Sequence, residues 1–161
     1  MVHELPHTSY CFVCGESNAF GLKLRFETDG RTVHARFLPQ PDHIGFRGVV
    51  HGGILSTVLD EIMVWACAVR TRRFAYCAEL NVRFINAVAP GIEIRVTGEL
   101  VANRKNRLFE ARGSLVDGAG KVLADAAGKY LPLKPDESSG MLGDLIGDTA
   151  WLADGRAVME H

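Results

Sequence analysis

The sequence predicts an α+β domain in which one long helix lies against an antiparallel sheet of about five to six strands. The helix is predicted by apolar residues that recur at steps of three and four between positions 54 and 66. The strands are predicted by segments of alternating apolar and polar residues, separated by turn residues such as Asp29-Gly30. A sheet with one buried face needs a large cover, and this helix is the one long apolar helix that the pattern offers.

The order of elements is two strands, the helix and then four strands in an antiparallel meander. Strands are expected over residues 22–28, 33–37, 78–88, 92–102, 108–116 and 121–131. Residues 1–21 form an N-terminal turn segment that contains a Cys-x-x-Cys motif, and residues 22–133 form the main domain. Residues 134–161 form a C-terminal tail with a weak helical pattern broken by glycines.

The composition fits one compact domain. A chain of 161 residues with 47% hydrophobic content can bury a single core. The formal net charge of -1 gives no general attraction to nucleic acid. Asp60 and Glu61 interrupt the longest apolar segment, so no membrane span is expected. The N-terminus lacks a basic region leading into an apolar one, so we expect no secretory signal and a cytoplasmic location.

Cys11 and Cys14 have the spacing of half a zinc site or of a redox pair. No second Cys-x-x-Cys and no close histidine pair follows to complete a tetrahedral set. The sequence therefore predicts reduced thiols packed at a turn, with no metal bound. A metal site with His3 or His7 as further ligands stays open as the alternative.

The most informative motif is His51-Gly52-Gly53 directly before the helix. Two glycines let backbone N–H groups approach a ligand with no Cβ in the way, and the helix dipole adds positive potential there. Asp60 lies eight residues beyond Gly52, or about 12 Å along a helix at ~1.5 Å per residue. One chain cannot bring both groups to one substrate carbonyl, so the spacing indicates a homodimer with sites built from both subunits.

These residues resemble a known family. The His-Gly-Gly motif with Asp60 nine residues after its histidine, and the run of residues 79–86 followed by Pro90-Gly91, resemble the hotdog-fold acyl-CoA thioesterases of the phenylacetate-pathway and thioesterase-superfamily type. The opening motif Cys11-x-x-Cys14 with its following glycine also looks like the start of many members. The resemblance covers about residues 11–133 and implies the hotdog fold, an acyl-CoA substrate, no cofactor, and a homodimer or a dimer of dimers.

The resemblance also implies roles for individual residues. Asp60 matches the catalytic carboxylate, acting as general base or nucleophile, and Gly52 matches the residue whose N–H polarises the thioester carbonyl. His51 matches the histidine that shapes this loop, and Gly53 helps to start the helix. Glu61 is the rival carboxylate, but it lies about 100° around the helix from Asp60, so the two cannot face the same pocket.

Two positions depart from the family pattern. Cys77 stands where relatives often have a serine or threonine that positions the water, and a thiol is a weaker hydrogen-bond partner. Gly45 stands where many relatives have an asparagine. Both positions bear on the rate and on the substrate range.

Substrate contacts are expected from two groups of residues. The walls of an acyl pocket are predicted at Gly45, Phe46, Met63, Val64 and Cys67. The phosphates of coenzyme A call for cations, which are predicted at Arg104, Lys105 and Arg107, followed by Arg70, Arg72 and Arg73. For any single one of these basic residues, a solvated surface position is the simpler interpretation.

Two other classes of function compete with the thioesterase. A noncatalytic acyl-CoA or acyl-carrier binding module would keep the fold without needing Asp60. A hotdog hydratase or dehydratase would need its own paired histidine and acid segment, and the sequence contains none. The thioesterase is the leading hypothesis and the binding module is second, with the acyl group unassigned.

Overall fold

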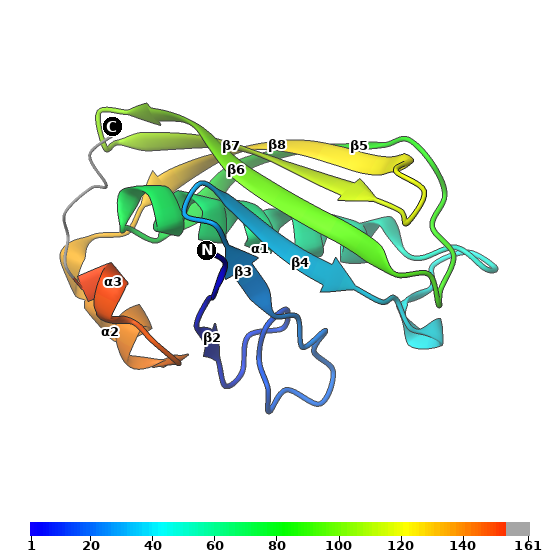
Figure 1. Ribbon diagram of the computed structural model, residues 1–161, viewed down its shortest axis with the longest axis horizontal. Helices are drawn as coiled ribbons and strands as arrows, with labels where there is room; N and C mark the ends of the chain where they lie inside the picture. Colours follow the sequence, from blue (N-terminus) through cyan, green and yellow to red (C-terminus); the bar gives the residue numbers. More distant parts are fainter. Residues whose placement is uncertain (154–161) are drawn as a thin grey trace.

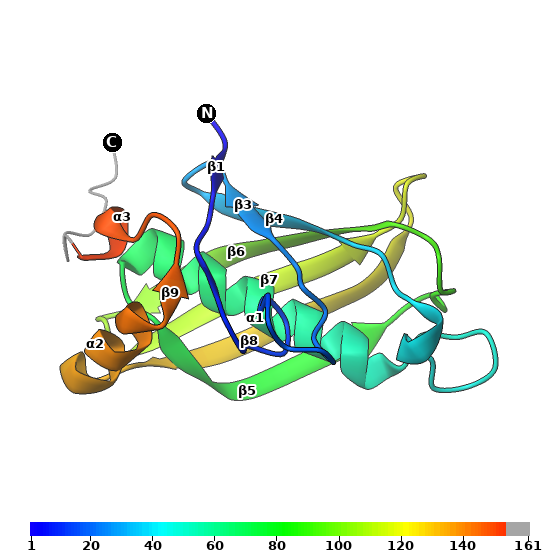
Figure 2. The ribbon, with the colours of Figure 1, turned by 90° about the horizontal axis from the view of Figure 1, so that it is seen from below.

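The architecture of the protein is set by one long helix, α1 (Gly52–Thr71), that lies across one face of a seven-stranded antiparallel sheet (Figures 1 and 2). The computed structural model describes residues 1–153. The strands of the main sheet are β1 (His3–Glu4), β3 (Phe26–Thr28), β4 (Thr32–Phe37), β5 (Ala75–Phe84), β6 (Ile94–Arg104), β7 (Leu108–Val116) and β8 (Val122–Pro132). The other elements are β2 (His7–Thr8), β9 (Leu145–Ile146), the 3-10 helix η1 (Pro41–His43), α2 (Pro135–Gly143) and α3 (Ala150–Ala153).

The strand order in the main sheet is β1-β3-β4-β6-β7-β8-β5. The predicted meander is therefore wrong at one point: β5 pairs with β8 and not with the strand that follows it. The reason is that α1 carries the chain over the face of the sheet after β4, so β5 begins at the far edge (Figure 2). β6, β7 and β8 then fill the space between β4 and β5, and β5 has a neighbour on one side only.

α1 packs closely on the sheet because small residues lie beneath it. A Cβ added at Gly98 of β6 would lie 2.8 Å from the backbone oxygen of Ile62, and one added at Gly113 of β7 would lie 3.1 Å from the Leu59 side chain. The helix residues that face the sheet are fully buried, as are the alternate residues of β7 and β8. These contacts set the depth of α1 on the sheet.

The C-terminal end of α1 uses the arginines that follow it. Arg72 adopts a left-handed conformation with φ 60° and donates its backbone N–H to Ala68, closing the helix. Its guanidinium lies 4.9 Å from the centre of the Trp151 ring. Arg73 donates to the backbone oxygens of Asn106 and Leu133. These contacts give Arg72 and Arg73 structural roles at the helix end.

The N-terminal segment and the tail meet beside α1. β2 pairs with β9 in a separate two-stranded sheet, and Leu152 of α3 is buried against the core. The predicted tail includes residues 154–161, which lie outside the described residues.

The expectation that no segment reaches membrane-spanning length is wrong for α1. By length and composition alone, its 20 residues are long and apolar enough to cross a bilayer. More than half of this segment is buried inside the protein, where its apolar side chains form the core. Core helices of this kind satisfy the same length and composition criteria.

We predict that Gly98→Ala destabilises the fold by about 1–3 kcal/mol, because its Cβ would press on the backbone of α1, which cannot turn aside. The measurement is urea unfolding followed by circular dichroism. The matched control is Gly118→Ala in the β7–β8 turn, where an added Cβ has no atom within 4 Å, and a shift within about 0.5 kcal/mol is expected. Equal stability of the two variants would contradict the close contact.

Candidate active site

The first turn of α1 leaves one backbone donor open. His51 is the N-cap, and its Nδ1 accepts the N–H of Gly53 at 2.8 Å. The N–H groups of Ile54 and Leu55 both donate to the backbone oxygen of His51, at 3.0 and 3.3 Å. Among residues 1–153, none accepts the N–H of Gly52. The positive end of the helix dipole therefore presents a single free N–H, at Gly52.

The imidazole of His51 is held in one orientation. Since Nδ1 accepts a hydrogen bond from Gly53, the neutral ring carries its proton on Nε2. A Cβ added at Gly45 would lie 3.0 Å from Cδ2 of this ring. Glycine at position 45 therefore leaves room for the histidine that caps α1, which gives a structural reason for the departure from asparagine.

A cavity of about 750 Å³ opens at this end of the helix. Of the predicted site residues, Gly45, Phe46, His51 and Gly52 line it. The remaining lining residues are Val49, Val50, Leu55, Phe84, Ile85, Asn86, Ala87 and Val88. Phe84, at the end of β5, lies close to Gly52. A Cβ added at Gly52 would lie 3.1 Å from the Phe84 ring. The cavity is thus largely apolar, and the free N–H belongs to one of its lining residues.

Asp60 lies on another part of α1 and contacts the sheet. Its Oδ1 accepts the Tyr130 hydroxyl at 3.0 Å. Tyr130 of β8 pairs directly with Cys77 of β5, next to a register shift between Cys77 and Glu79. Burial and the charge of Asp60, to which the thiol hydrogen-bonds, raise the pKa of Cys77 to about 11. Near neutral pH Cys77 is therefore a protonated thiol beside Asp60.

Tyr130 is the functional residue that the sequence analysis missed. Its hydroxyl contacts the carboxylate from a strand 70 positions away. Burial, followed by the charge of Asp60, raises the pKa of the phenol, so it stays a donor. A Cβ added at Gly128 would lie 2.5 Å from the tyrosine ring, so glycine is needed two residues earlier on the same face of β8. The sequence signal for this contact was Gly128 two residues before Tyr130, at positions that share the inward face of one strand.

The two halves of the predicted site are separate within one chain. Gly52 contacts the Phe84 end of β5, and Asp60 contacts the residue pair at its Cys77 end. Eight residues of helix correspond to about 12 Å. The structure thus brings His51, Gly52, Gly45 and Phe46 together, and leaves Asp60 and Cys77 in a second group.

The other predicted pocket walls lie elsewhere in the described chain. Met63 and Cys67 have no exposed surface, and Met63 packs toward Gly113 in the core. Val64 is half-buried and packs on the edge of the core. These three residues lie on α1 beyond Asp60 and do not line the cavity at Gly52.

The predicted cations lie at the far end of the helix. Arg104, Lys105 and Arg107 form the tight turn between β6 and β7, and Arg104 is paired with Glu110 at 3.3 Å. The bond from Arg73 to Asn106 places this turn beside the C-terminal end of α1. A helix of 20 residues spans roughly 30 Å, so within one chain these cations do not reach the cavity at Gly52.

Glu61 faces a different set of groups from Asp60. Its Oε1 is the hydrogen-bond acceptor for the Cys11 thiol, with 3.6 Å between the atoms. Cys11, Cys14 and Glu61 have ligand atoms that all lie within 4.8 Å of one another. They are the residues in the described chain that could hold a metal ion, and the predicted His3 and His7 do not join them.

The segment that carries this geometry matches a known family model. The model of the thioesterase superfamily matches residues 47–124, which run from the cavity loop through α1 to β8. The match covers just under half of the 161 residues of the chain. No curated protein matches the chain.

Solved structures of thioesterase-superfamily proteins share the fold. One crystallised superfamily protein aligns with a TM-score of 0.70 at 24% identity, covering 75% of this chain and 59% of that protein, so this chain spans less than two thirds of its length. Thioesterase superfamily member 2 from zebra fish aligns with a TM-score of 0.66 at 21% identity, covering 73% and 89% of the two chains. A Streptococcus mutans protein bound to acetyl CoA aligns with a TM-score of 0.59 at 14% identity, covering 63% and 81%. The predicted hotdog fold is confirmed.

We predict that Cys77 is slow to react with iodoacetamide although it is exposed. A pKa of about 11 leaves about a hundredfold less thiolate at pH 8 than the ordinary value of 9.0 does. Because the pKa is raised, alkylation should accelerate about tenfold per pH unit up to about pH 11. Labelling followed by mass spectrometry measures this, with the urea-unfolded chain as control. If the folded protein were alkylated at pH 8 as fast as the unfolded chain, the raised pKa of Cys77 beside Asp60 would be contradicted.

Proposed function

We propose that the protein hydrolyses the thioester of a small to medium acyl-CoA. The observation that carries this proposal is the N–H of Gly52, which no group within residues 1–153 accepts and which belongs to a residue lining a cavity at the positive end of a helix. Such a donor stabilises the oxyanion that forms when a thioester carbonyl is attacked. The superfamily match and the structures of relatives with bound acetyl CoA or coenzyme A support an acyl-CoA substrate.

The proposed chemistry needs one carboxylate and one water. Asp60 takes a proton from the water, whose oxygen adds to the thioester carbonyl, and the oxyanion accepts the Gly52 N–H. Collapse of this intermediate breaks the carbon–sulfur bond, and the coenzyme A thiolate takes up the proton held by Asp60. In the alternative route Asp60 itself adds to the carbonyl and expels the coenzyme A thiolate. Water then hydrolyses the anhydride to the free acid and the Asp60 carboxylate, and the proton released in this step goes to the thiolate. In both routes Tyr130 and Cys77 hold the carboxylate in place.

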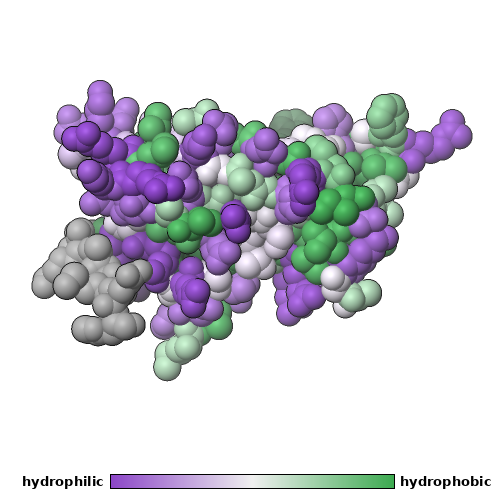
Figure 3. Space-filling view, turned by 90° about the horizontal axis from the view of Figure 1, so that it is seen from above, coloured by the Kyte–Doolittle hydropathy of each residue, from purple (hydrophilic) through white to green (hydrophobic). Residues whose placement is uncertain are grey.

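We propose that two subunits complete each site. β5 is an edge strand of 10 residues with β8 as its one neighbour, and long open edges are normally covered. Hydrophobic patches interrupt the hydrophilic surface in Figure 3. The exposed large hydrophobic residues of the protein include Tyr76 and Phe84 of β5 and Ile85, which follows β5. Edge-to-edge pairing of two β5 strands would cover this edge.

Antiparallel pairing of the two β5 strands explains how the halves of the site meet. Gly52 lies at the Phe84 end of β5 and Asp60 at its Cys77 end. A two-fold axis near the middle of the strand places the Cys77 end of one subunit beside the Phe84 end of the other. Gly52 of the partner subunit then approaches Asp60, which resolves the separation of about 12 Å within one chain.

The cavity indicates the kind of acyl group. Its volume of about 750 Å³ lies in the usual range for small-molecule sites, and its lining is mostly apolar. We therefore propose that it receives the acyl chain with the carbonyl at Gly52. A panel of short, medium, long and aromatic acyl-CoAs, assayed by release of free thiol, tests the activity. Tight binding of acyl-CoA with no turnover of any member would favour the noncatalytic binding module.

We predict that Gly52→Pro lowers kcat by about 10²–10³-fold, because it removes the oxyanion donor. Proline is well tolerated at the first position of a helix, and His51 already has the extended ψ of 130° that a residue before proline requires. The matched control is Gly52→Ala, which adds the same Cβ near the half-exposed Phe84 ring but keeps the N–H. Kinetics on the best acyl-CoA distinguish the two. Equal losses would show that the Cβ, and not the N–H, is responsible.

Asp60→Asn is predicted to lower kcat by about a hundredfold or more, since it removes the base while keeping the shape. Glu93→Gln, an exposed carboxylate on the loop before β6, is the control and should keep parental activity. Thermal unfolding checks that both variants are folded.

The shared site predicts complementation between the two inactive variants. When Asp60→Asn and Gly52→Pro chains are refolded together, half of the dimers are mixed and each mixed dimer has one intact site, so about a quarter of the parental activity should return. The separately refolded variants, mixed just before the assay, are the control. No recovery in dimers shown by mass spectrometry to be mixed would mean that each site lies within one subunit.

A further inference from the structure

The turn at residues 11–15 is built to present two sulfur atoms. The Gly15 N–H donates to the backbone oxygen of Cys11 at 2.8 Å, and the Val13 N–H donates to Cys11 Sγ at 3.3 Å. A Cβ at Gly15 would lie 2.3 Å from that same oxygen, so the turn closes only with glycine at this position. Backbone N–H groups aimed at sulfur stabilise a thiolate, which is the form that binds metal.

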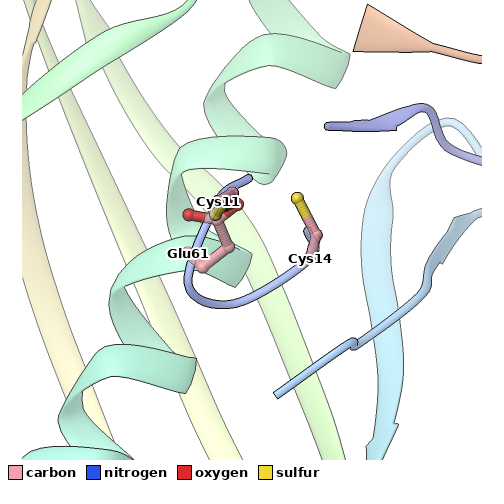
Figure 4. A group of neighbouring side chains, drawn as sticks. All are labelled: Cys11, Cys14 and Glu61. Atoms are coloured by element: carbon pink, nitrogen blue, oxygen red, sulfur yellow. Dashed lines mark hydrogen bonds between the residues drawn. The ribbon is translucent and has the colours of Figure 1, made fainter. Parts of the chain in front are cut away.

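The helix supplies a third ligand. Figure 4 shows the turn beside α1, with the side chains of Cys11 and Glu61 side by side and Cys14 next to them. The separation of 3.6 Å between Cys11 Sγ and Glu61 Oε1 matches a tetrahedral edge, which is roughly 3.5 Å for Zn–S and Zn–O bonds of about 2.3 and 2.0 Å. One pair of the set already has the spacing that a zinc ion requires, and all three ligand atoms lie within 4.8 Å of one another.

The surroundings of the three groups favour a cation. Three acidic side chains converge, and in the described part of the chain no lysine or arginine forms an ion pair with Glu61. A cation bound at this point would therefore not compete with a paired basic side chain for the Glu61 carboxylate.

The neighbouring polar groups support this arrangement. Thr8 Oγ1 accepts the Cys11 N–H at 2.9 Å and lies 3.8 Å from Cys14 Sγ, so its own proton is free to point to that sulfur. His7 is engaged elsewhere, because its Nε2 lies 3.0 Å from Glu16. The histidine alternative of the sequence analysis therefore gives way to the carboxylate of Glu61.

We propose that Cys11, Cys14 and Glu61 bind a zinc ion, with water as the fourth ligand. Binding releases the protons of the two thiols and of the carboxyl group, and involves no redox change. The ion would fasten the N-terminal segment to α1 at the residue next to Asp60, on the side of the helix turned away from it. This replaces the expectation of a metal-free turn, because the missing ligand comes from a residue 50 positions away in the chain.

The test uses cobalt as a spectroscopic probe of the full chain, purified without a histidine tag, treated with chelator and kept reduced. One equivalent of Co²⁺ should produce a thiolate-to-cobalt charge-transfer band and the visible bands of a tetrahedral site, and Zn²⁺ should bleach them. Zn²⁺ should also raise Tm by several degrees. Cys14→Ser should at least halve the thiolate band, because one of the two thiolates is lost, and Glu61→Gln should weaken Zn²⁺ binding at least tenfold. The matched control is Cys77→Ser, which should bind like the parent.

Three outcomes would overturn the proposal. The first is the absence of cobalt bands in folded, reduced parent protein. The second is thiolate-to-cobalt absorption of parental intensity in both Cys11→Ser and Cys14→Ser. The third is a disulfide between Cys11 and Cys14 in protein freshly purified without oxidant, detected by mass spectrometry. Elemental analysis of the same preparation should find about one zinc per chain.

Discussion

The close contact between α1 and the sheet is the constraint on which the site depends. The backbone of α1 at Ile62 lies against Gly98 of β6, so the helix cannot slide or rise without losing this contact. Asp60 and Glu61 lie within one turn of that point and are therefore fixed at one depth. A carboxylate that must meet a carbonyl to within a fraction of an ångström needs such support. The glycines under the helix thus serve the chemistry as well as the packing.

The second constraint is the open edge of β5. The crossover of α1 places β5 at the edge of the sheet, and its two ends contact the two halves of the proposed site. A fold with β5 in the interior would hide both halves from a partner. Covering the edge and completing the site are therefore the same event in the proposed dimer, so the loss of subunit pairing should abolish activity as well as lower stability.

The sequence predicted those features that are written into consecutive residues. The helix after His51-Gly52-Gly53 and the strand over 108–116 are local patterns, and the structure has both of them. The pairing of β5 and the approach of Tyr130 to Asp60 depend on which strands the crossover separates, and alternation within a strand carries no such information. The cation prediction rested on residue type, and the turn at Arg104 lies at the far end of α1 because of hairpin length and register.

The two adjacent carboxylates show how one step along a helix separates two kinds of chemistry. Asp60 points to β8, where the Tyr130 hydroxyl donates to its Oδ1 and orients the carboxylate. Glu61 points about 100° away, to a turn whose sulfur atoms are themselves acids. A carboxylate that accepts a hydroxyl proton is kept ionised and oriented, whereas a carboxylate among thiols is suited to share a cation with them. The proposed roles of Asp60 as the catalytic residue and of Glu61 as a metal ligand therefore rest on their neighbours, since their positions in the sequence differ by one.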